Sequence, residues 1–434
     1  MLTAEENDLL CRVGPGTPMG NLLRRYWTPA LLSSEAPEPD SPPVRVRLLG
    51  EDLVAFRDTN GAVGLVKENC PHRGASLFFG RNEDCGLRCV YHGWKFDTNG
   101  DCVDMPSEPA ESVFKSKVHA TAYPTRESGG IVWTYMGPAE KLPGFREIVS
   151  PELPQERWRA MKVYGYCNWV QGLEGNVDAA HTSYLHRNLS FSTLTPDETD
   201  APGFPSLNMT FLIWAYDVAP KLEVHDTWYG FRYAGLRKTP GGHTHARVTD
   251  YIFPYLTYIP AAPVGGNDCI LMVPIDDNAY WRYHVSTKAP VQLRGGMKQQ
   301  GMPNRPSGIM ERAWMPENDY QMDREAQRTQ SFTGIPGGAI PQDQAVTESM
   351  GIIYNRTSER LGTSDMAIIR MRRLLIAAAK DLDKGIEPMA LDAEASYNDF
   401  RASEKILAAG EDWRILGTQA DPVMQQLEPI SVAT

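Results

Sequence analysis

Two short cysteine–histidine pairs limit the fold of this 434-residue chain more than any other feature of its sequence. Cys70 and His72 form the first pair, and Cys89 and His92 form the second. Two cysteines and two histidines can bind one tetrahedral zinc ion, but a zinc finger usually takes both cysteines from one pair. Here each pair mixes the two ligand types, so each of two loops can give one ligand to each metal of a binuclear cluster. A Rieske [2Fe–2S] centre has this requirement, because two cysteines hold one iron and two histidines hold the other.

The residues around these pairs favour a small β domain. The segments VRVRLLG and LVAFRD alternate between apolar and polar residues, and the turn Thr59–Gly61 predicts a hairpin after them. Gly74 and Gly93 allow tight loops that aim backbone N–H groups at cluster sulfurs. We therefore predict an antiparallel β core over about residues 40–145, inside a first domain of residues 1–150.

Charge and hydropathy argue against two classes of protein. The chain has 43 Lys and Arg against 54 Asp and Glu, and this net charge of -11 disfavours a nucleic-acid-binding protein. No run of 18 apolar residues is present, so no membrane-spanning helix is predicted. The acidic start MLTAEENDLL does not resemble a secretory signal, and the seven cysteines are an odd number. We expect a cytoplasmic protein without a disulfide framework.

Residues 151–434 predict a second domain of the α+β class, with an antiparallel sheet and helices against it. The segment NWVQGLEGNVDAAHTSYLH, residues 168–186, predicts a helix, and further helices are predicted at about 365–383 and 392–410. Four strand-like runs lie between the first helix and the last two: KLEVHDTWYGFRYAGLR, HARVTDYIFPYLTYIP, CILMVPI and AYWRYHVST.

A second metal site is expected in this domain. Asp178, His181 and His186 lie on the predicted helix of residues 168–186, together with Glu174. The two histidines are five residues apart, so they can share one metal only if the helix widens or ends between them. Two imidazoles and one carboxylate with open positions are typical of non-heme Fe(II) oxygenases. Carboxylates for such a site occur in PENDYQMDREAQ, which contains Glu317, Asp319, Asp323 and Glu325, although charged clusters of this kind are commonly solvated.

The segments CPHRGA and CVYHGWKFD closely resemble the Rieske signature. NWVQGLEGNVDAAHTSYLH and ENDYQMDREAQ are similar to the iron-binding segments of the phthalate dioxygenase group of Rieske oxygenases. The resemblance covers nearly the whole chain, and it implies a Rieske β domain followed by a helix-grip catalytic domain. It also implies a [2Fe–2S] cluster on Cys70, His72, Cys89 and His92, and one Fe(II) on His181, His186 and Asp319.

The same resemblance implies a role for Asp178 other than binding the metal. In the family, the matching acid accepts hydrogen bonds from an iron-ligand histidine and from a Rieske histidine of the neighbouring subunit. A head-to-tail ring of three subunits, or a stack of two rings, brings those histidines together. We therefore expect Asp178 to couple the two metal centres across a subunit interface.

The resemblance implies an oxygenase that uses O2 and electrons from NAD(P)H. No nucleotide or flavin motif is present in the sequence, so a separate reductase with a flavin and a plant-type [2Fe–2S] cluster is expected. Enzymes of the phthalate group mostly oxidise aromatic carboxylates, for which arginine is the suitable anchor. We predict Arg232 and Arg247 as substrate contacts, from a set that also includes Arg237 and Arg282. Residues 188–231 contain no arginine, which favours a substrate less charged than phthalate.

Three functions remain open at this point. The first is ring hydroxylation of an aromatic acid, and the second is O- or N-dealkylation of a substituted aromatic compound by a Rieske monooxygenase. These two share all the motifs, so the sequence does not separate them. The third is an electron carrier or a zinc-stabilised binding protein, which would need no second iron site.

Overall fold

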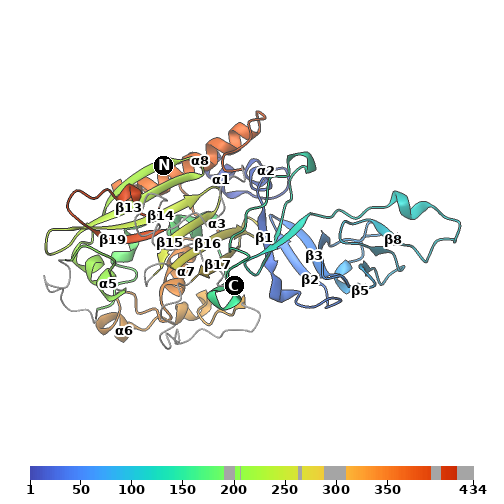
Figure 1. Ribbon diagram of the computed structural model, residues 1–434, viewed down its shortest axis with the longest axis horizontal. Helices are drawn as coiled ribbons and strands as arrows, with labels where there is room; N and C mark the ends of the chain where they lie inside the picture. The colour runs from blue at the N-terminus through green and yellow to red at the C-terminus, as the bar shows by residue number, and fades with distance from the viewer. Residues whose placement is uncertain (190–200, 206, 262–265, 288–308, 392–401, 418–434) are drawn as a thin grey trace.

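The chain folds into a slender β-rich part at one end and a larger part of mixed helices and strands at the other (Figure 1). The computed structural model describes residues 1–189, 201–205, 207–261, 266–287, 309–391 and 402–417. This arrangement confirms the predicted α+β class, with a small N-terminal β-rich part followed by a part built on one large, mainly antiparallel sheet. No helix of the described residues combines the length and the apolar character needed to span a bilayer.

The first two helices pack against the C-terminal part of the chain. Helix α1 (Ala4–Cys11) begins with a capping box formed by Thr3 and Glu6, a pattern that the S/T-x-x-E spacing of the sequence predicts. Helix α2 (Pro18–Leu23) is capped by Thr17. Both helices lie against α8 (Met366–Leu382), and their buried residues share one hydrophobic core with it. The glycine-rich segment between α1 and α2 is therefore a connection between two short helices.

Three small antiparallel sheets form the β-rich part. The predicted hairpin at Thr59–Gly61 is present, because it joins β3 to β4. One side of this part has its own hydrophobic core, which includes Phe56, Leu87 and Phe96 and also Cys70 and Cys89. Other residues of the first two sheets join the larger core. The strands are β1 (Thr28–Leu32), β9 (Thr125–Ser128) and β10 (Ile131–Thr134) in one sheet; β2 (Val44–Leu48), β3 (Glu51–Arg57) and β4 (Val63–Lys67) in the second; and β5 (Arg81–Glu83), β6 (Gly86–Arg88), β7 (Lys95–Phe96) and β8 (Cys102–Asp104) in the third.

One large sheet of nine strands carries the catalytic part of the described chain. Six of its strands follow one another as an antiparallel meander, and β11 then pairs with the last of them. Helix α3 (Trp169–Asn176) packs on β16 and on α7 (Ala339–Ser349), while α5 (Leu207–Tyr216) lies against β13. The strands are β11 (Trp158–Gly165), β12 (Lys221–Thr227), β13 (Gly230–Lys238), β14 (Thr244–Ile252), β15 (Leu256–Ala261), β16 (Gly266–Pro274), β17 (Tyr280–Thr287), β18 (Ile309–Met310) and β19 (Ser403–Leu407).

The expected helix at 365–383 is confirmed as α8, but two other helix predictions need correction. The helix predicted over 168–186 ends at Asn176, because Gly175 and Asn176 are poor helix formers, so both histidines lie outside it. Of the helix predicted at 392–410, residues 392–401 lie outside the described part, and Ser403–Leu407 form strand β19 instead. This strand pairs with the half of β14 that β15 leaves open, so tertiary pairing overrides local helix propensity.

Candidate metal centres

Two loops of the β-rich part present the cysteine–histidine pairs with the same backbone conformation. The N–H of Gly74 donates to the carbonyl of Cys70 at 2.9 Å, and the N–H of Gly93 donates to the carbonyl of Cys89 at 3.0 Å. The N–H of each cysteine donates a hydrogen bond of 2.8 Å to the carbonyl of the residue five positions later in the chain. Both glycines have positive φ values, +75° and +77°, which explains why a residue without a side chain stands at each position.

In these loops the two cysteine side chains lie together, and the two histidine side chains lie together. The thiols of Cys70 and Cys89 interact with each other and are buried, whereas the rings of His72 and His92 meet with centroids 4.4 Å apart and are half-buried. Trp94 stacks on the His72 ring at 4.2 Å. Burial raises the pKa of the Cys70 thiol to about 11, and the neighbouring Cys89 adds to this effect. The thiols are thus on the inside and the imidazoles on the outside, as a cluster with one iron on each pair requires.

A single zinc ion does not fit these four residues. Ligands of one zinc ion lie about 2.0–2.3 Å from it, so their donor atoms are within roughly 4 Å of one another. In the described part of the chain, no three donor atoms of these four residues lie within 4.8 Å of one another. The group that meets this condition is elsewhere in the chain. Two separate pairs, one of thiols and one of imidazoles, suit a binuclear cluster between them.

The segment after α3 presents the two histidines of the second centre. Asp178 follows the end of the helix, and its Oδ1 accepts hydrogen bonds from the backbone N–H groups of Ala180 at 2.6 Å and His181 at 3.3 Å. These bonds turn the chain into a short 3₁₀ helix over His181–Ser183, and His186 follows one turn later. The helix therefore ends before either histidine, and both rings point to one place.

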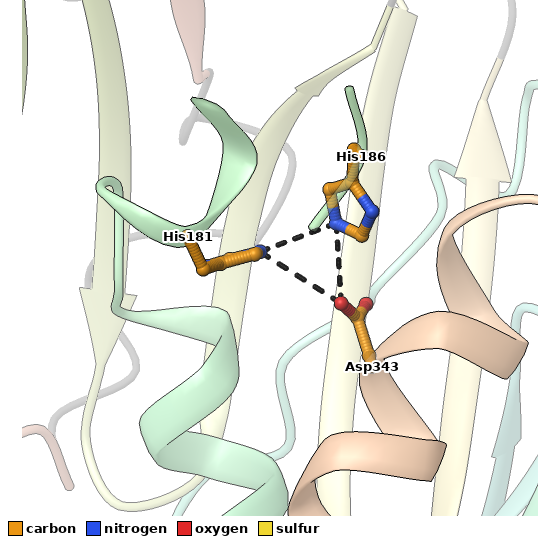
Figure 2. A group of neighbouring side chains, drawn as sticks. All are labelled: His181, His186 and Asp343. Atoms are coloured by element: carbon orange, nitrogen blue, oxygen red, sulfur yellow. Dashed lines mark hydrogen bonds and ion pairs between the residues drawn. The ribbon is translucent and has the colours of Figure 1, made fainter. Parts of the chain in front are cut away.

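Asp343 completes a group of three donor atoms with these histidines (Figure 2). The Nε2 atoms of His181 and His186 are 3.2 Å apart, and Oδ1 of Asp343 lies 3.1 Å from the His186 nitrogen and 3.7 Å from the His181 nitrogen. Three donors bonded to one ion at about 2.1 Å and at right angles lie about 3.0 Å apart. The three atoms can therefore occupy one face of an octahedron and leave the opposite face open.

The outer nitrogen of each ring lies near an acceptor, but only that of His186 is within hydrogen-bond distance of it. His186 Nδ1 lies 2.8 Å from Oε1 of Gln342, an acceptor, so the ring proton belongs on Nδ1. His181 Nδ1 lies 3.7 Å from Oδ2 of Asp178. Burial raises the pKa of the Asp343 carboxyl, but His186 and His181 outweigh burial and leave this pKa below its ordinary value. The donor set of two neutral imidazoles and one carboxylate fits Fe(II).

The structure corrects the predicted carboxylate. Asp319 is exposed on the 3₁₀ segment Pro316–Gln321 and is not in the group formed by His181 and His186. The other acids of this segment are also exposed, and two of them have local partners: Asp323 caps helix α6 (Arg324–Thr329), and Glu325 pairs with Arg328. The charged segment is thus a solvated surface, and the carboxylate beside the histidines comes from α7.

The two predicted substrate arginines lie on opposite faces of the large sheet. Gly235 faces Ala179 of the histidine segment and stands directly opposite Arg247, so Arg247 shares the face of the metal site. Arg232 is three residues before Gly235, and alternation turns it to the other face. There it pairs with Asp250 at 2.9 Å and donates to the carbonyls of residues 414 and 416. Arg232, which the sequence analysis predicts as a substrate contact, therefore lies on the face away from the metal site.

Arg247 remains a candidate for binding substrate, but its charge is already paired with a carboxylate. Its Nη1 lies 2.7 Å from Oε2 of Glu404, whose other oxygen lies 2.8 Å from His245 Nε2. The Thr210 hydroxyl of α5 donates to the same carboxylate at 2.6 Å. Burial lowers the pKa of His186, but Asp343 and Gln342 outweigh burial and raise it. Arg247 opposes this rise, so its network borders the metal site.

Sequence reasoning missed Asp343 and Gln342 because it did not predict helix α7. A signal was available in the segment AIPQDQAVTES, where the only acidic residue near the start is flanked by two glutamines. In the structure both glutamines are buried, which is unusual for this residue type. Buried amides around one acid indicate a polar site inside the protein.

Comparisons with known proteins agree with both centres. The family described as "Rieske [2Fe-2S] domain" matches residues 26–124, and the family described as "LigXa C-terminal domain like" matches residues 134–431. The oxygenase subunit of phthalate 4,5-dioxygenase from Pseudomonas putida is 41% identical over 95% of this chain and 94% of its own length.

Two further relatives extend this result. The oxygenase subunit of 5,5'-dehydrodivanillate O-demethylase from Sphingobium sp. is 35% identical over 92% of this chain and 85% of its own length. The solved structure of the terminal oxygenase of carbazole 1,9a-dioxygenase from Nocardioides aromaticivorans shares the fold, with a TM-score of 0.54 and 17% identity. That similarity covers 86% of this chain and 97% of the other.

Proposed function

Because the chain belongs to the Rieske non-heme iron oxygenases, we propose that it is the terminal oxygenase that hydroxylates an aromatic carboxylate. The observation that carries this proposal is the presence of two different metal-binding constellations in one chain. The convergent donors of His181, His186 and Asp343 supply the site for oxygen chemistry that an electron carrier would not need. The aromatic carboxylate is supported by the similarity to an enzyme whose name gives phthalate as its substrate.

We assign the [2Fe–2S] cluster to Cys70, His72, Cys89 and His92, and the Fe(II) to His181, His186 and Asp343. When bound, the cluster supplies electrons and the ferrous ion activates O2 for insertion into a C–H or C=C bond. The protein holds Asp343 and the Nε2 atoms in position through Gln342 and the Asp178 turn. The segment before His181 joins the hydrophobic core that α3 shares with the large sheet, which supports the inner side of this site.

Electrons are proposed to come from a separate NAD(P)H-dependent reductase with a flavin and a plant-type [2Fe–2S] cluster. The relatives are named as oxygenase subunits or terminal oxygenases, which are parts of larger systems. Figure 1 shows the strands of the cluster domain at the end of the molecule away from α3 and α7. We therefore propose a head-to-tail homotrimer, or two stacked trimers, in which Asp178 accepts hydrogen bonds from His181 and from a cluster histidine of the adjacent subunit.

Oxidative dealkylation is the second candidate function. It is favoured by the 35% identity to a protein named as an O-demethylase. The iron ligands, the cluster and the electron donor would be the same in both reactions. The two functions differ in which bond of the substrate is held closest to the iron.

The product of a single turnover distinguishes the two functions. The purified, chemically reduced protein is exposed to ¹⁸O2 with a panel of aromatic acids and methoxy-aromatic compounds, and the products are identified by mass. Two labelled atoms in a cis-diol indicate a ring dioxygenase, whereas one labelled atom and released formaldehyde indicate dealkylation. Absence of a labelled product from every aromatic acid, in protein with about three iron atoms per chain, would contradict the proposed substrate class.

A further inference from the structure

The face of the large sheet that α3 covers carries a second polar group beside the metal site. We call this face the inner face. A Cβ on Gly172 of α3 would meet Tyr280 and Met272 at 2.8 and 3.2 Å, so both residues lie on this face. Arg282 stands directly opposite Met272, and His284 follows two residues later on the same strand. Alternation therefore places both Arg282 and His284 on the inner face.

Arg282 is a buried cation without a carboxylate partner in the described part of the chain. Its side chain is 8% exposed, and its Nη1 is buried without a hydrogen-bond partner there. It interacts electrostatically with Asp343 and Asp268 but forms no ion pair within 4.0 Å with any described acid. Other buried arginines, such as Arg312 and Arg356, have a carboxylate within 2.7 Å. An unpaired buried charge is costly, so the position suits a cation that receives an anion from outside.

The two acids that interact electrostatically with Arg282 already have other partners. Asp343 belongs to the proposed iron ligands, and Asp268 Oδ1 lies 2.8 Å from His284 Nε2. Burial raises the pKa of the Asp268 carboxyl, but His284, Ser286 and Arg282 outweigh burial and bring this pKa down to about 2. Asp268 is therefore ionised and holds one side of the His284 ring.

His284 has a polar atom left for a ligand. Both of its ring nitrogens are buried, and Nδ1 has no hydrogen-bond partner among the described residues. The other nitrogen faces Asp268, although its short contact is not aligned as a hydrogen bond. Arg282 and His284 thus offer one positive charge and one hydrogen-bonding nitrogen on the same face of one strand.

We propose that Arg282 binds the carboxylate of an aromatic monocarboxylate and that His284, held by Asp268, contacts a polar substituent of the same ring. The inference rests on the proposed function and specifies its substrate. A guanidinium binds a carboxylate through two parallel hydrogen bonds, which fixes the orientation of the ring. A second carboxylate would need a second free cation. Of the other arginines on this face, Arg247 is paired with Glu404, and Arg237 already donates to a carbonyl and two hydroxyls of the histidine segment.

Binding measurements on the iron-loaded, cluster-loaded protein test the role of Arg282. Benzoate, 3-methoxybenzoate, phthalate and benzamide are titrated calorimetrically without oxygen into the wild type and the variants Arg282→Gln, Arg282→Lys and Arg247→Gln. We expect the wild type to prefer benzoate to benzamide, and Arg282→Gln to lose about 100-fold in affinity for the two monocarboxylates while binding benzamide unchanged. The lysine variant should keep part of the preference, and Arg247→Gln should keep most of it.

Several outcomes would overturn the inference, and they are distinguishable. If Arg282→Gln keeps the preference for carboxylates, or if phthalate binds more tightly than benzoate, Arg282 is not the single anchor although the substrate class stands. If the wild type shows no preference for benzoate over benzamide, the proposed substrate class fails as well. His284→Phe should weaken 3-methoxybenzoate by about tenfold and leave benzoate unchanged, and an equal loss for both ligands would refute the second contact.

Discussion

Asp343 is the residue that turns two histidines into a metal site. Its carboxylate lies within 3.7 Å of both Nε2 atoms, and its pKa is lowered although burial alone would raise it. Without this charge, two imidazoles would hold a divalent cation only weakly. The histidine spacing alone did not reveal this acid, because α7 enters the site from a distant part of the sequence.

At the residue scale, Asp343→Ala is expected to lose the mononuclear iron and to keep the cluster. Iron content should fall from about three to about two atoms per chain, because the [2Fe–2S] ligands are in another domain. The matched variant Asp319→Ala should keep about three, because that side chain is exposed and apart from the histidines. Iron analysis and the visible spectrum of the cluster measure both quantities. If Asp319→Ala lost the iron and Asp343→Ala kept it, Asp319 and not Asp343 would be the iron ligand.

At the element scale, the two cluster loops share a conformation but differ in their surroundings. A Cβ on Gly93 would lie 2.7 Å from Cγ of Pro106, whereas a Cβ on Gly74 would meet nothing within 4 Å. Both positions have a positive φ, which costs about 1 kcal/mol for alanine. The second loop is therefore held more tightly by its neighbours than the first.

We expect Gly93→Ala to lose more cluster than Gly74→Ala. The first variant combines backbone strain with a clash against a rigid proline ring, while the second has the strain alone. The fraction of cluster retained after purification, and the melting temperature of the domain, measure the difference. Equal losses in the two variants would show that φ alone decides the stability of the loops.

Strand β19 ties the last described residues to the sheet through a buried acid. Arg247, His245 and the Thr210 hydroxyl outweigh the effect of burial and lower the pKa of the Glu404 carboxyl to about 2. A carboxyl with a folded pKa below its unfolded value stabilises the fold above the unfolded value, which is 4.5 here. This contribution, roughly 3 kcal/mol, is lost as the pH falls from about 5 to about 2.

Glu404→Gln is therefore expected to flatten the dependence of the unfolding free energy on pH between about 5 and 2. At pH 7 the variant should be less stable, because Arg247 keeps its charge without a partner. Denaturant unfolding at several pH values measures this, and Asp412→Asn, which removes a half-buried carboxylate of the same C-terminal part, is the control. An unchanged slope in Glu404→Gln would contradict the lowered pKa.

At the scale of the whole molecule, the two metal centres belong to different cores. The cluster cysteines Cys70 and Cys89 lie in a core of the β-rich part, while the histidine segment joins the core under the large sheet. Figure 1 shows the β-rich part and the large sheet towards opposite ends of the molecule. This separation supports the proposed head-to-tail assembly, in which the cluster of one subunit would meet the mononuclear site of the next.

Asp178→Asn tests this assembly. The asparagine retains the Oδ1 acceptor for the Ala180 and His181 N–H groups, so the turn should persist while the charge is lost. We expect intact cluster and iron, an unchanged trimer, and turnover reduced by about 100-fold. Rapid mixing of the reduced protein with O2 and substrate should show slow oxidation of the cluster. Turnover at the wild-type rate would refute the bridging role.

The sequence by itself determined what depends on neighbouring residues. The capping box of α1, the hairpin at Thr59–Gly61, the α+β class and the order of the two domains could all be predicted. The cysteine–histidine pairs could be found because each loop carries both of its ligands within four residues. Local spacing is sufficient when one loop contains the whole pattern.

Only the tertiary structure decided which distant residues meet. It replaced Asp319 by Asp343, turned Arg232 away from the metal site and left Arg282 as the buried cation beside it. Local patterns do not contain this information, because the packing of α7 and the register of β13, β14 and β17 decide which side chains share a face. A one-residue change in register would exchange every inner side chain for an outer one, so the site depends on the fold as a whole.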